Sequence, residues 1–224
     1  ENVMVDNVLI DMYVKCGVIE AAENVFDRII VRDVISWTTL LMGYLECGNS
    51  KETLACFNCA LYDGVNLNDV AYVCGLKACS SIQALTKGRE IHSYVVKKGM
   101  ERETSVTSSL IDMYGKCGSI YEATKVFDNV PCKDAVTWGA MIAAFAQHGH
   151  YTKVGEYVEQ MQAEGLRPTE IIYINILAAC SHGGFLHRGY ASFTLMREEH
   201  GIRPNIKHYS GMADLLSRVG HLGK

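Results

Sequence analysis

Proline is scarce in this chain, and long apolar runs are absent from it. Only three of the 224 residues are proline, so long stretches lack the residue that most strongly interrupts helices. No run of about 18 apolar residues occurs, which excludes an ordinary transmembrane helix. The signatures HxE followed by PCxxC, HExxH, GxSxG and GxxxxGK with Ser or Thr are also missing. We therefore expect no enzyme activity in this segment, no catalytic residue, no metal site and no cofactor.

Charge is nearly balanced, with a formal net charge of −4 and a pI near 6.1. Such a balance excludes a strongly basic surface that surrounds a nucleic acid, but it is compatible with a local stripe of basic residues. The nine cysteines include one CxxC, Cys56 to Cys59, without a second pair at zinc-ribbon spacing. Buried free cysteine behaves as a small hydrophobe. We expect the cysteines to serve packing in a reducing compartment.

What the chain has instead is internal repetition. The decapeptide VLIDMYVKCG at 8–17 returns as SLIDMYGKCG at 109–118, NVFD at 24–27 returns as KVFD, SW at 36–37 returns as TW, and LKACS at 76–80 returns as LAACS. Each copy lies 101 residues after its counterpart. A fixed offset over four separate matches indicates a repeat array rather than one globular core.

Apolar residues at helical spacing divide this period into helix-turn-helix units. In the first helix, Leu9, Met12 and Tyr13 are expected to share one face, and Trp37 and Trp138 are expected in the core. The units read from the sequence are 3–33, 34–68, 69–103, 104–134, 135–169, 170–205 and an incomplete 206–224. The predicted fold is all-α: a right-handed superhelical α-solenoid forming one array over residues 1–224.

These motifs resemble the pentatricopeptide repeat proteins of land plants, in the subclass that alternates P-, L- and S-type repeats. LIDMYGKCGSI with KVFD at 110–128 is similar to an S-type repeat, VISW at 34–37 to a P-type opening, and LKACS with GREIH at 76–92 to an L-type repeat. The resemblance implies the order S, P, L, S, P, L, S for the seven units. The last would be the final S-type repeat of a fragment; in this subclass a C-terminal extension follows that repeat, and a deaminase-like domain can follow the extension.

The resemblance also implies a code in which each repeat reads one RNA base. The fifth and last residues of a repeat read the base, and the second residue packs against its face. The pairs at these positions are Asn7 with Asp33, Thr38 with Asn68, and Ser108 with Asp134. By the family's code they would read a pyrimidine, adenosine and guanosine respectively.

The packing positions of the resembling repeats hold Met4, Ile35 and Val136. Ser105, the packing residue of the fourth unit, departs from the aliphatic pattern, and Gly139 in the fifth unit has no side chain with which to read a base. The plain alternative for the polar residues is helix capping, because Asn, Asp, Ser and Thr are common at helix starts.

The resemblance implies sequence-specific binding of single-stranded organellar RNA, as the specificity factor of cytidine-to-uridine editing in a mitochondrion or chloroplast. Editing-complex proteins would be further partners, with no membrane and no small-molecule substrate. The alternative from another class is a protein-protein scaffold of the tetratricopeptide kind. Polar fifth and last residues kept in register favour RNA, because a peptide groove has no need of them.

Overall fold

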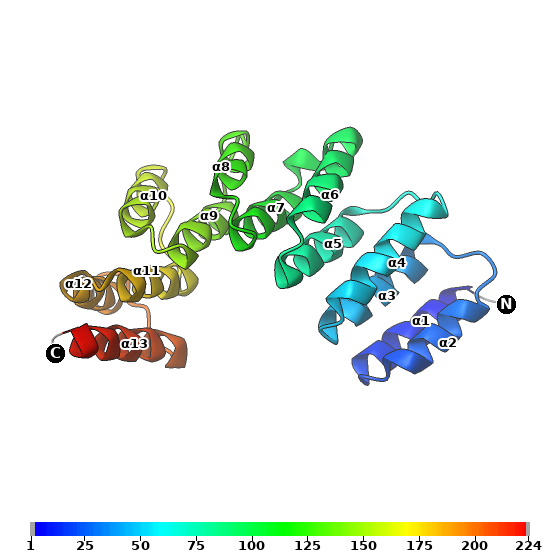
Figure 1. The fold of residues 1–224 in the computed structure, drawn as a ribbon, viewed down its shortest axis with the longest axis horizontal. Helices are drawn as coiled ribbons and strands as arrows, with labels where there is room; N and C mark the ends of the chain where they lie inside the picture. The colour runs from blue at the N-terminus through cyan, green and yellow to red at the C-terminus, as the bar shows by residue number, and fades with distance from the viewer. Residues whose placement is uncertain (1–2, 223–224) are drawn as a thin grey trace. The chain divides into compact units, whose positions relative to one another are not determined.

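The computed structural model describes residues 3–222, which form helices and connecting turns without a β-strand in that range (Figure 1). The bounds are α1 (Val3–Lys15), α2 (Ile19–Arg28), α3 (Val34–Glu46), α4 (Ser50–Tyr62), α5 (Asp69–Ile82), α6 (Leu85–Lys98), the 3-10 helix η1 (Met100–Arg102), α7 (Thr104–Lys116), α8 (Ile120–Asp128), α9 (Ala135–Gln147), α10 (Tyr151–Ala163), α11 (Glu170–Gly183), α12 (Leu186–Glu198) and α13 (Ile206–Leu222). The all-α prediction is confirmed. The first two residues of the predicted array and the last two of its unit 206–224 lie outside the described residues.

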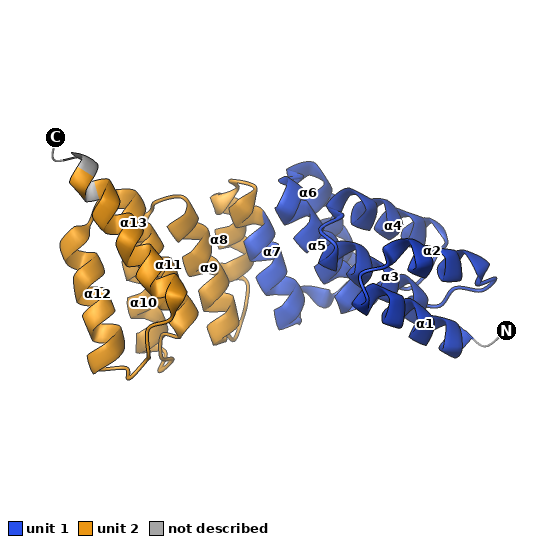
Figure 2. Cartoon of the chain, turned by 90° about the horizontal axis from the view of Figure 1, so that it is seen from below, with its two compact units in different colours: residues 1–113 blue, residues 114–224 orange. Residues whose placement is uncertain are grey.

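The chain divides into two compact units, residues 1–113 and 114–224 (Figure 2). Each is built by sequential packing of helical hairpins. In unit 1, α1 contacts α2 and α3, and α3 contacts α4 and α5; in unit 2, α9 contacts α10 and α11, and α11 contacts α12 and α13. Figure 2 shows α1 and α3 on one side of unit 1 and α2 and α4 on the other. This is the packing mode of an α-solenoid, in which each hairpin buries its apolar face on its neighbours. The predicted right-handed course and the S, P and L assignments stay predictions.

The same aromatic pair holds a hairpin to the next in both units. Phe26 meets Trp37, and Phe127 meets Trp138, each with ring centroids 4.8 Å apart and an interplanar angle of 74°. Both tryptophans are buried, with 3% and 2% of their surface exposed, as the sequence predicted. Edge-to-face pairs add to the apolar burial, so this contact ties each second helix to the following first helix.

The face of α1 that holds Leu9, Met12 and Tyr13 is not its most buried face. Asn7, Ile10 and Val14 are its buried residues, whereas Met12 is 43% exposed. Its counterpart Met113 is fully buried, and the Met113 side chain lies against Gly88 of α6. The difference has a tertiary cause, because no helix precedes α1 among the described residues to cover Met12.

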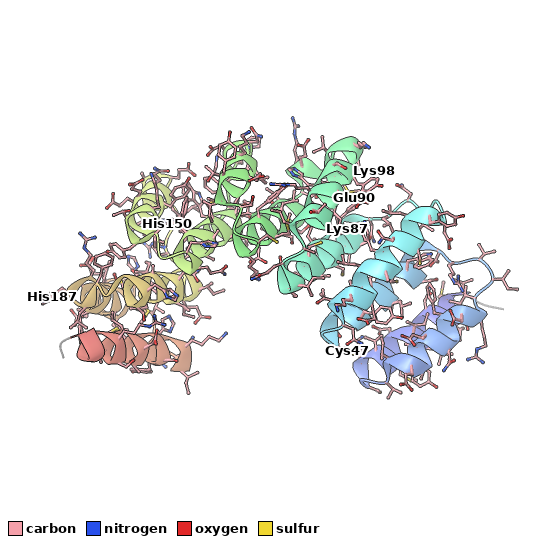
Figure 3. The ribbon with its side chains drawn as sticks, in the orientation of Figure 1. Cys47, Lys87, Glu90, Lys98, His150 and His187 are labelled. Atoms are coloured by element: carbon pink, nitrogen blue, oxygen red, sulfur yellow. The ribbon has the colours of Figure 1, made fainter. Side chains whose placement is uncertain are left out.

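The cysteines divide by position. Cys56, Cys74, Cys79 and Cys180 are buried, as expected for packing, and burial raises the pKa of Cys56 to about 12. The prediction is wrong for Cys16, Cys47, Cys59 and Cys132, which are exposed; Cys47 lies just after α3 (Figure 3). Among the side chains that the structure describes, no group of three is placed to hold a metal ion. None of the described helices is both long and apolar enough to cross a membrane.

Candidate nucleic-acid interface

A groove in unit 1 runs between the N-terminal half of α1 and the start of α3, with a cavity volume of about 500 Å³. We call it the α1–α3 groove. It is lined by Met4, Asn7, Val8, Asp11, Asp33, Ile35 and Thr39. Four of the residues singled out from the sequence therefore meet here: the first reading pair and the packing residues of two successive repeats. Met4 and Ile35 are 75% and 56% exposed, so apolar side chains of two successive repeats border the groove.

The two polar residues of the groove are joined to each other. The Asn7 Nδ2 amide donates to Asp33 Oδ1 over 3.2 Å. Asp33 is also the N-cap of α3, because the same oxygen accepts from the backbone N–H and the hydroxyl of Ser36, both at 2.8 Å. A side chain of α1 is thereby fixed to the first turn of the next repeat, which holds the polar centre of the groove in one arrangement.

The Asn7 amide has an unused acceptor. Asn7 is 7% exposed, and its Oδ1 atom is buried without a hydrogen-bond partner among the described residues. The orientation of the amide follows from chemistry, since only the NH₂ end can donate to a carboxylate. Buried polar atoms are nearly always paired in folded proteins. The orphan oxygen therefore indicates a place for a donor from a ligand.

Asp33 stays ionised well into the acid range. Desolvation is the largest single influence and raises the pKa of its carboxyl group. The hydrogen bonds from the backbone and hydroxyl of Ser36 and from Asn7 lower it, and together they prevail, so that the pKa lies below its usual value. The carboxylate is the form that accepts these bonds, and the groove keeps its negative charge at neutral pH.

The second predicted pair also lies in unit 1, at the starts of α3 and α5. Thr38 is 7% exposed, and its hydroxyl donates to the carbonyl oxygens of Val34 at 2.8 Å and Ile35 at 3.1 Å. Asn68 caps α5, with Oδ1 accepting from the Ala71 N–H at 3.1 Å. The Thr38 proton is therefore already used in these hydrogen bonds, and the hydroxyl oxygen can act only as an acceptor toward any further group.

The third pair is divided between the units, with Ser108 in unit 1 and Asp134 in unit 2. The Ser108 hydroxyl donates to the carbonyl oxygen of Thr104 at 2.7 Å. Asp134 caps α9 as Asp33 caps α3, accepting from the backbone N–H and hydroxyl of Thr137, both at 2.8 Å. Val136, the packing residue of this repeat, is 60% exposed in the first turn of α9.

Helix capping thus explains part of the polar pattern but not all of it. Asp33, Asn68 and Asp134 each cap the first helix of the following hairpin, as the plain alternative required. Capping does not explain why the Asn7 amide reaches from another helix to Asp33, or why its acceptor is left unpaired. The α1–α3 groove carries both observations, and the reading roles of the six polar residues stay proposals.

Sequence reasoning missed Val8, Asp11 and Thr39 as lining residues. Val8 is 63% exposed and follows Met4 by one helical turn, a spacing that places both on one face. That spacing was the available signal. The contribution of Thr39 depends on how α3 packs against α1.

The fold and the groove define a class: a helical-hairpin repeat protein whose first helices carry polar pairs at the junctions between repeats. The sequence profile described as "PPR repeat" matches residues 7–34, 35–65, 105–133 and 136–166, which together make up more than half of the chain. The chain belongs to the pentatricopeptide repeat family.

Relatives from Arabidopsis thaliana extend this match over nearly the whole chain. Pentatricopeptide repeat-containing protein At2g33680 is 39% identical over 214 residues, covering 96% of this chain and 29% of the relative. Pentatricopeptide repeat-containing protein DOT4, chloroplastic, is 39% identical over 211 residues, covering 94% of this chain and 24% of the relative. The chain therefore spans less than a third of the length of these two relatives. Several matching relatives are named as chloroplastic proteins.

Solved structures show the same fold. The crystal structure of the pentatricopeptide repeat protein PPR10, known from maize, in complex with an 18-nt psaJ RNA element matches with a TM-score of 0.80 at 17% identity. The match covers 100% of this chain and 34% of PPR10. The predicted solenoid of helical hairpins is confirmed by this likeness.

Proposed function

We propose that this chain binds single-stranded RNA in a base-specific manner, with the α1–α3 groove as one base site. The observation that carries the proposal is the fixed Asn7–Asp33 pair with its unpaired amide oxygen, in the groove that the exposed Met4 and Ile35 side chains also line. A flat base fits between two apolar side chains, and its edge then meets the amide. The RNA-bound structure of PPR10 supports this use of the fold.

Uridine is the base that suits the Asn7 site best. The free Oδ1 atom of Asn7 accepts one hydrogen bond, and the N3–H of uracil is a donor on the base edge. The paired Nδ2 group donates to Asp33 and holds the acceptor in place. This agrees with the pyrimidine that the family's code assigns to an Asn and Asp pair.

We further propose that the protein is an editing specificity factor of the alternating P, L and S subclass, acting in a plant organelle. The motif types and their order support this, and the relatives named as chloroplastic favour the chloroplast over the mitochondrion. The expected partial site, read 5′ to 3′ along the array, is pyrimidine-A-n-G-n-n-n. Editing-complex proteins would be the further partners.

The test is Asn7→Ser, which leaves Asp33 in place and recreates the Ser and Asp pair of the fourth unit. Preference at the first base should move from uridine to guanosine, by roughly five- to a hundredfold, because a good base-edge contact discriminates by about 1–3 kcal/mol. The measurement is competition binding with RNAs that differ only at that base.

Asn24→Ser is the matched control, since it makes the same chemical change on the exposed surface of α2 in the same hairpin. It should leave the preference unaltered. An unchanged preference in Asn7→Ser, with helical content intact by circular dichroism, would return Asn7 and Asp33 to a purely structural role. Absence of RNA binding by the parent chain would favour the protein-protein scaffold.

A further inference from the structure

A second groove in unit 1 lies among α2, α3 and α4, with a cavity volume of about 590 Å³. We call it the α2–α4 groove. Its lining includes Glu23, Asp27, Trp37, Glu52, Cys56 and Asp63. None of these residues lines the α1–α3 groove, so the RNA proposal makes no use of this one.

Unit 2 holds the equivalent surface 101 residues later, and there it is filled. Tyr157 stands in the position of Cys56, and its ring packs on Phe127, Trp138 and Phe145 with centroid distances of 5.4, 5.9 and 4.9 Å. The hollow beside Cys56 is therefore the place that an aromatic ring occupies in the sister repeat. The Phe and Trp pair beneath is the same in both.

The indole N–H groups of the two equivalent tryptophans also differ between the units, because one is hydrogen-bonded and the other is not. Trp138 Nε1 donates to Glu164 Oε2 over 3.2 Å. The counterpart of Glu164 is Asp63, and both residues follow the last turn of their helix. Asp63 is shorter by one methylene, and the Trp37 N–H has no hydrogen-bond partner in the described range. Trp37 is 97% buried, and Trp37 and Asp63 both line the groove.

The charge of the α2–α4 groove is strongly one-sided. Four carboxylates line it, and Arg32 is its one basic residue. Arg32 lies over the Phe26 ring at 4.5 Å and pairs with Asp27 at 3.7 Å, while the Tyr44 hydroxyl donates to Glu23 at 2.6 Å. Within residues 3–222, no basic side chain is in salt-bridge distance of Glu52 or Asp63. In unit 2 the position of Glu52 is held by Lys153.

We propose that the α2–α4 groove is a docking site for a basic segment of a partner protein. A Lys or Arg side chain of the partner would lie against Glu52 and Asp63, and a carbonyl oxygen of the same segment would accept from Trp37 Nε1. A peptide supplies both groups. Each of its residues has a backbone carbonyl oxygen that can accept a hydrogen bond, and each Lys or Arg adds a positive charge. Charge complementarity selects this partner over an RNA, whose phosphates the carboxylates repel.

The two tryptophans provide the readout. We would titrate the ¹⁵N-labelled 224-residue chain with an acetylated, amidated Gly-Arg-Gly-Lys-Gly peptide and follow the indole N–H resonances. The Trp37 signal should move and the Trp138 signal, already bonded to Glu164, should not. A Gly-Gln-Gly-Gln-Gly peptide should cause no change. Movement of both signals, of neither, or an equal response to the glutamine peptide would overturn the proposal.

Two variants place the residue found in unit 2 at the equivalent position of the α2–α4 groove in unit 1. Glu52→Lys should weaken peptide binding roughly tenfold or more, whereas Glu20→Lys makes the same reversal on the exposed start of α2 and should not. Cys56→Tyr should close the groove and abolish the Trp37 response while Trp138 stays unchanged. Equal effects of the two lysine variants would refute the site. Arginine amide that binds as tightly as the peptide would also refute it, in favour of a small organic cation.

Discussion

At the scale of single residues, one hydrogen bond gives this chain a polar site that its sequence pattern only outlined. Asn7 and Asp33 are 26 positions apart, and the amide-to-carboxylate bond of 3.2 Å joins them across a repeat boundary. A polar residue at each position is common at helix starts. Their contact, with one amide oxygen left unpaired, is more than two independent helix caps would require, and it is the observation on which the proposed base site depends.

The lowered pKa of Asp33 predicts how this site responds to acid. A carboxyl group whose pKa is lower in the folded state contributes stability above its unfolded pKa of about 3.9 and loses it as the pH falls through the folded value. We therefore expect the contribution of Asp33 to stability to be constant from pH 8 to pH 5 and to disappear only below about pH 4.

The measurement is urea unfolding of the parent chain and of Asp33→Asn at several pH values. The amide keeps an oxygen for the α3 cap but does not titrate. The difference in unfolding midpoint should be level at neutral pH and shrink in acid. A difference that already changes between pH 5 and 7 would show that Asp33 is not held ionised by Ser36 and Asn7.

At the scale of elements, the first helices of successive hairpins approach each other closely. The two units accommodate this close contact with different side chains. In unit 1 the small residue is Gly43 of α3, where an added Cβ would press on Val14 Cγ2 and lie 3.0 Å from Ile19 Cδ1. In unit 2 the counterpart of Val14 is Gly115, where a Cβ would lie 2.7 Å from Ala144 Cβ. In unit 1 the larger side chain of the contact belongs to the earlier helix, whereas in unit 2 it belongs to the later one. In both contacts a glycine makes room for the larger residue.

Gly43→Ala should destabilise the chain by about 1–3 kcal/mol through overpacking, less the ~0.5–1 kcal/mol that Ala contributes in a helix interior. Val14→Ala leaves room for the new methyl group. The double variant should therefore cost less than the sum of the single ones, with a coupling of about 0.5–3 kcal/mol. A cycle of urea midpoints measures this, and additive costs would show that Val14 is not what confines Gly43.

Hydrogen bonds repeat between elements as well. Ser80 near the end of α5 donates to Asp112 of α7 at 3.3 Å, and Ser181 of α11 donates to Asp214 of α13. These aspartates occupy equivalent helix positions in the sequence. The contacts give Asp112 and Asp214 a structural function, because each joins one hairpin to the next.

At the scale of the whole molecule, the balanced charge limits how strongly RNA binding depends on salt. Binding of single strands weakens by a slope of about −0.7 in log affinity against log salt for each phosphate neutralised. With a net charge of −4, we expect few phosphate contacts and a shallow slope. Gel-shift titration of single-stranded RNA over a salt series measures it, with duplex RNA of the same sequence as the control. Equal affinity for the duplex would contradict binding in grooves that accept unpaired bases.

The sequence by itself determined the helical hairpins and the repeat family, because both depend on local spacing: apolar residues at helical period, and motifs that return after 101 residues. It also placed Trp37 and Trp138 in the core, since equivalent positions in a repeat share equivalent surroundings. Tertiary structure decided what depends on a neighbour from another helix. Met12 is exposed while Met113 is buried, and the Trp37 N–H is unpaired while that of Trp138 is bonded. Equivalent residues of the repeated motifs thus differ in burial and hydrogen bonding, because both depend on which side chains the adjoining helices supply.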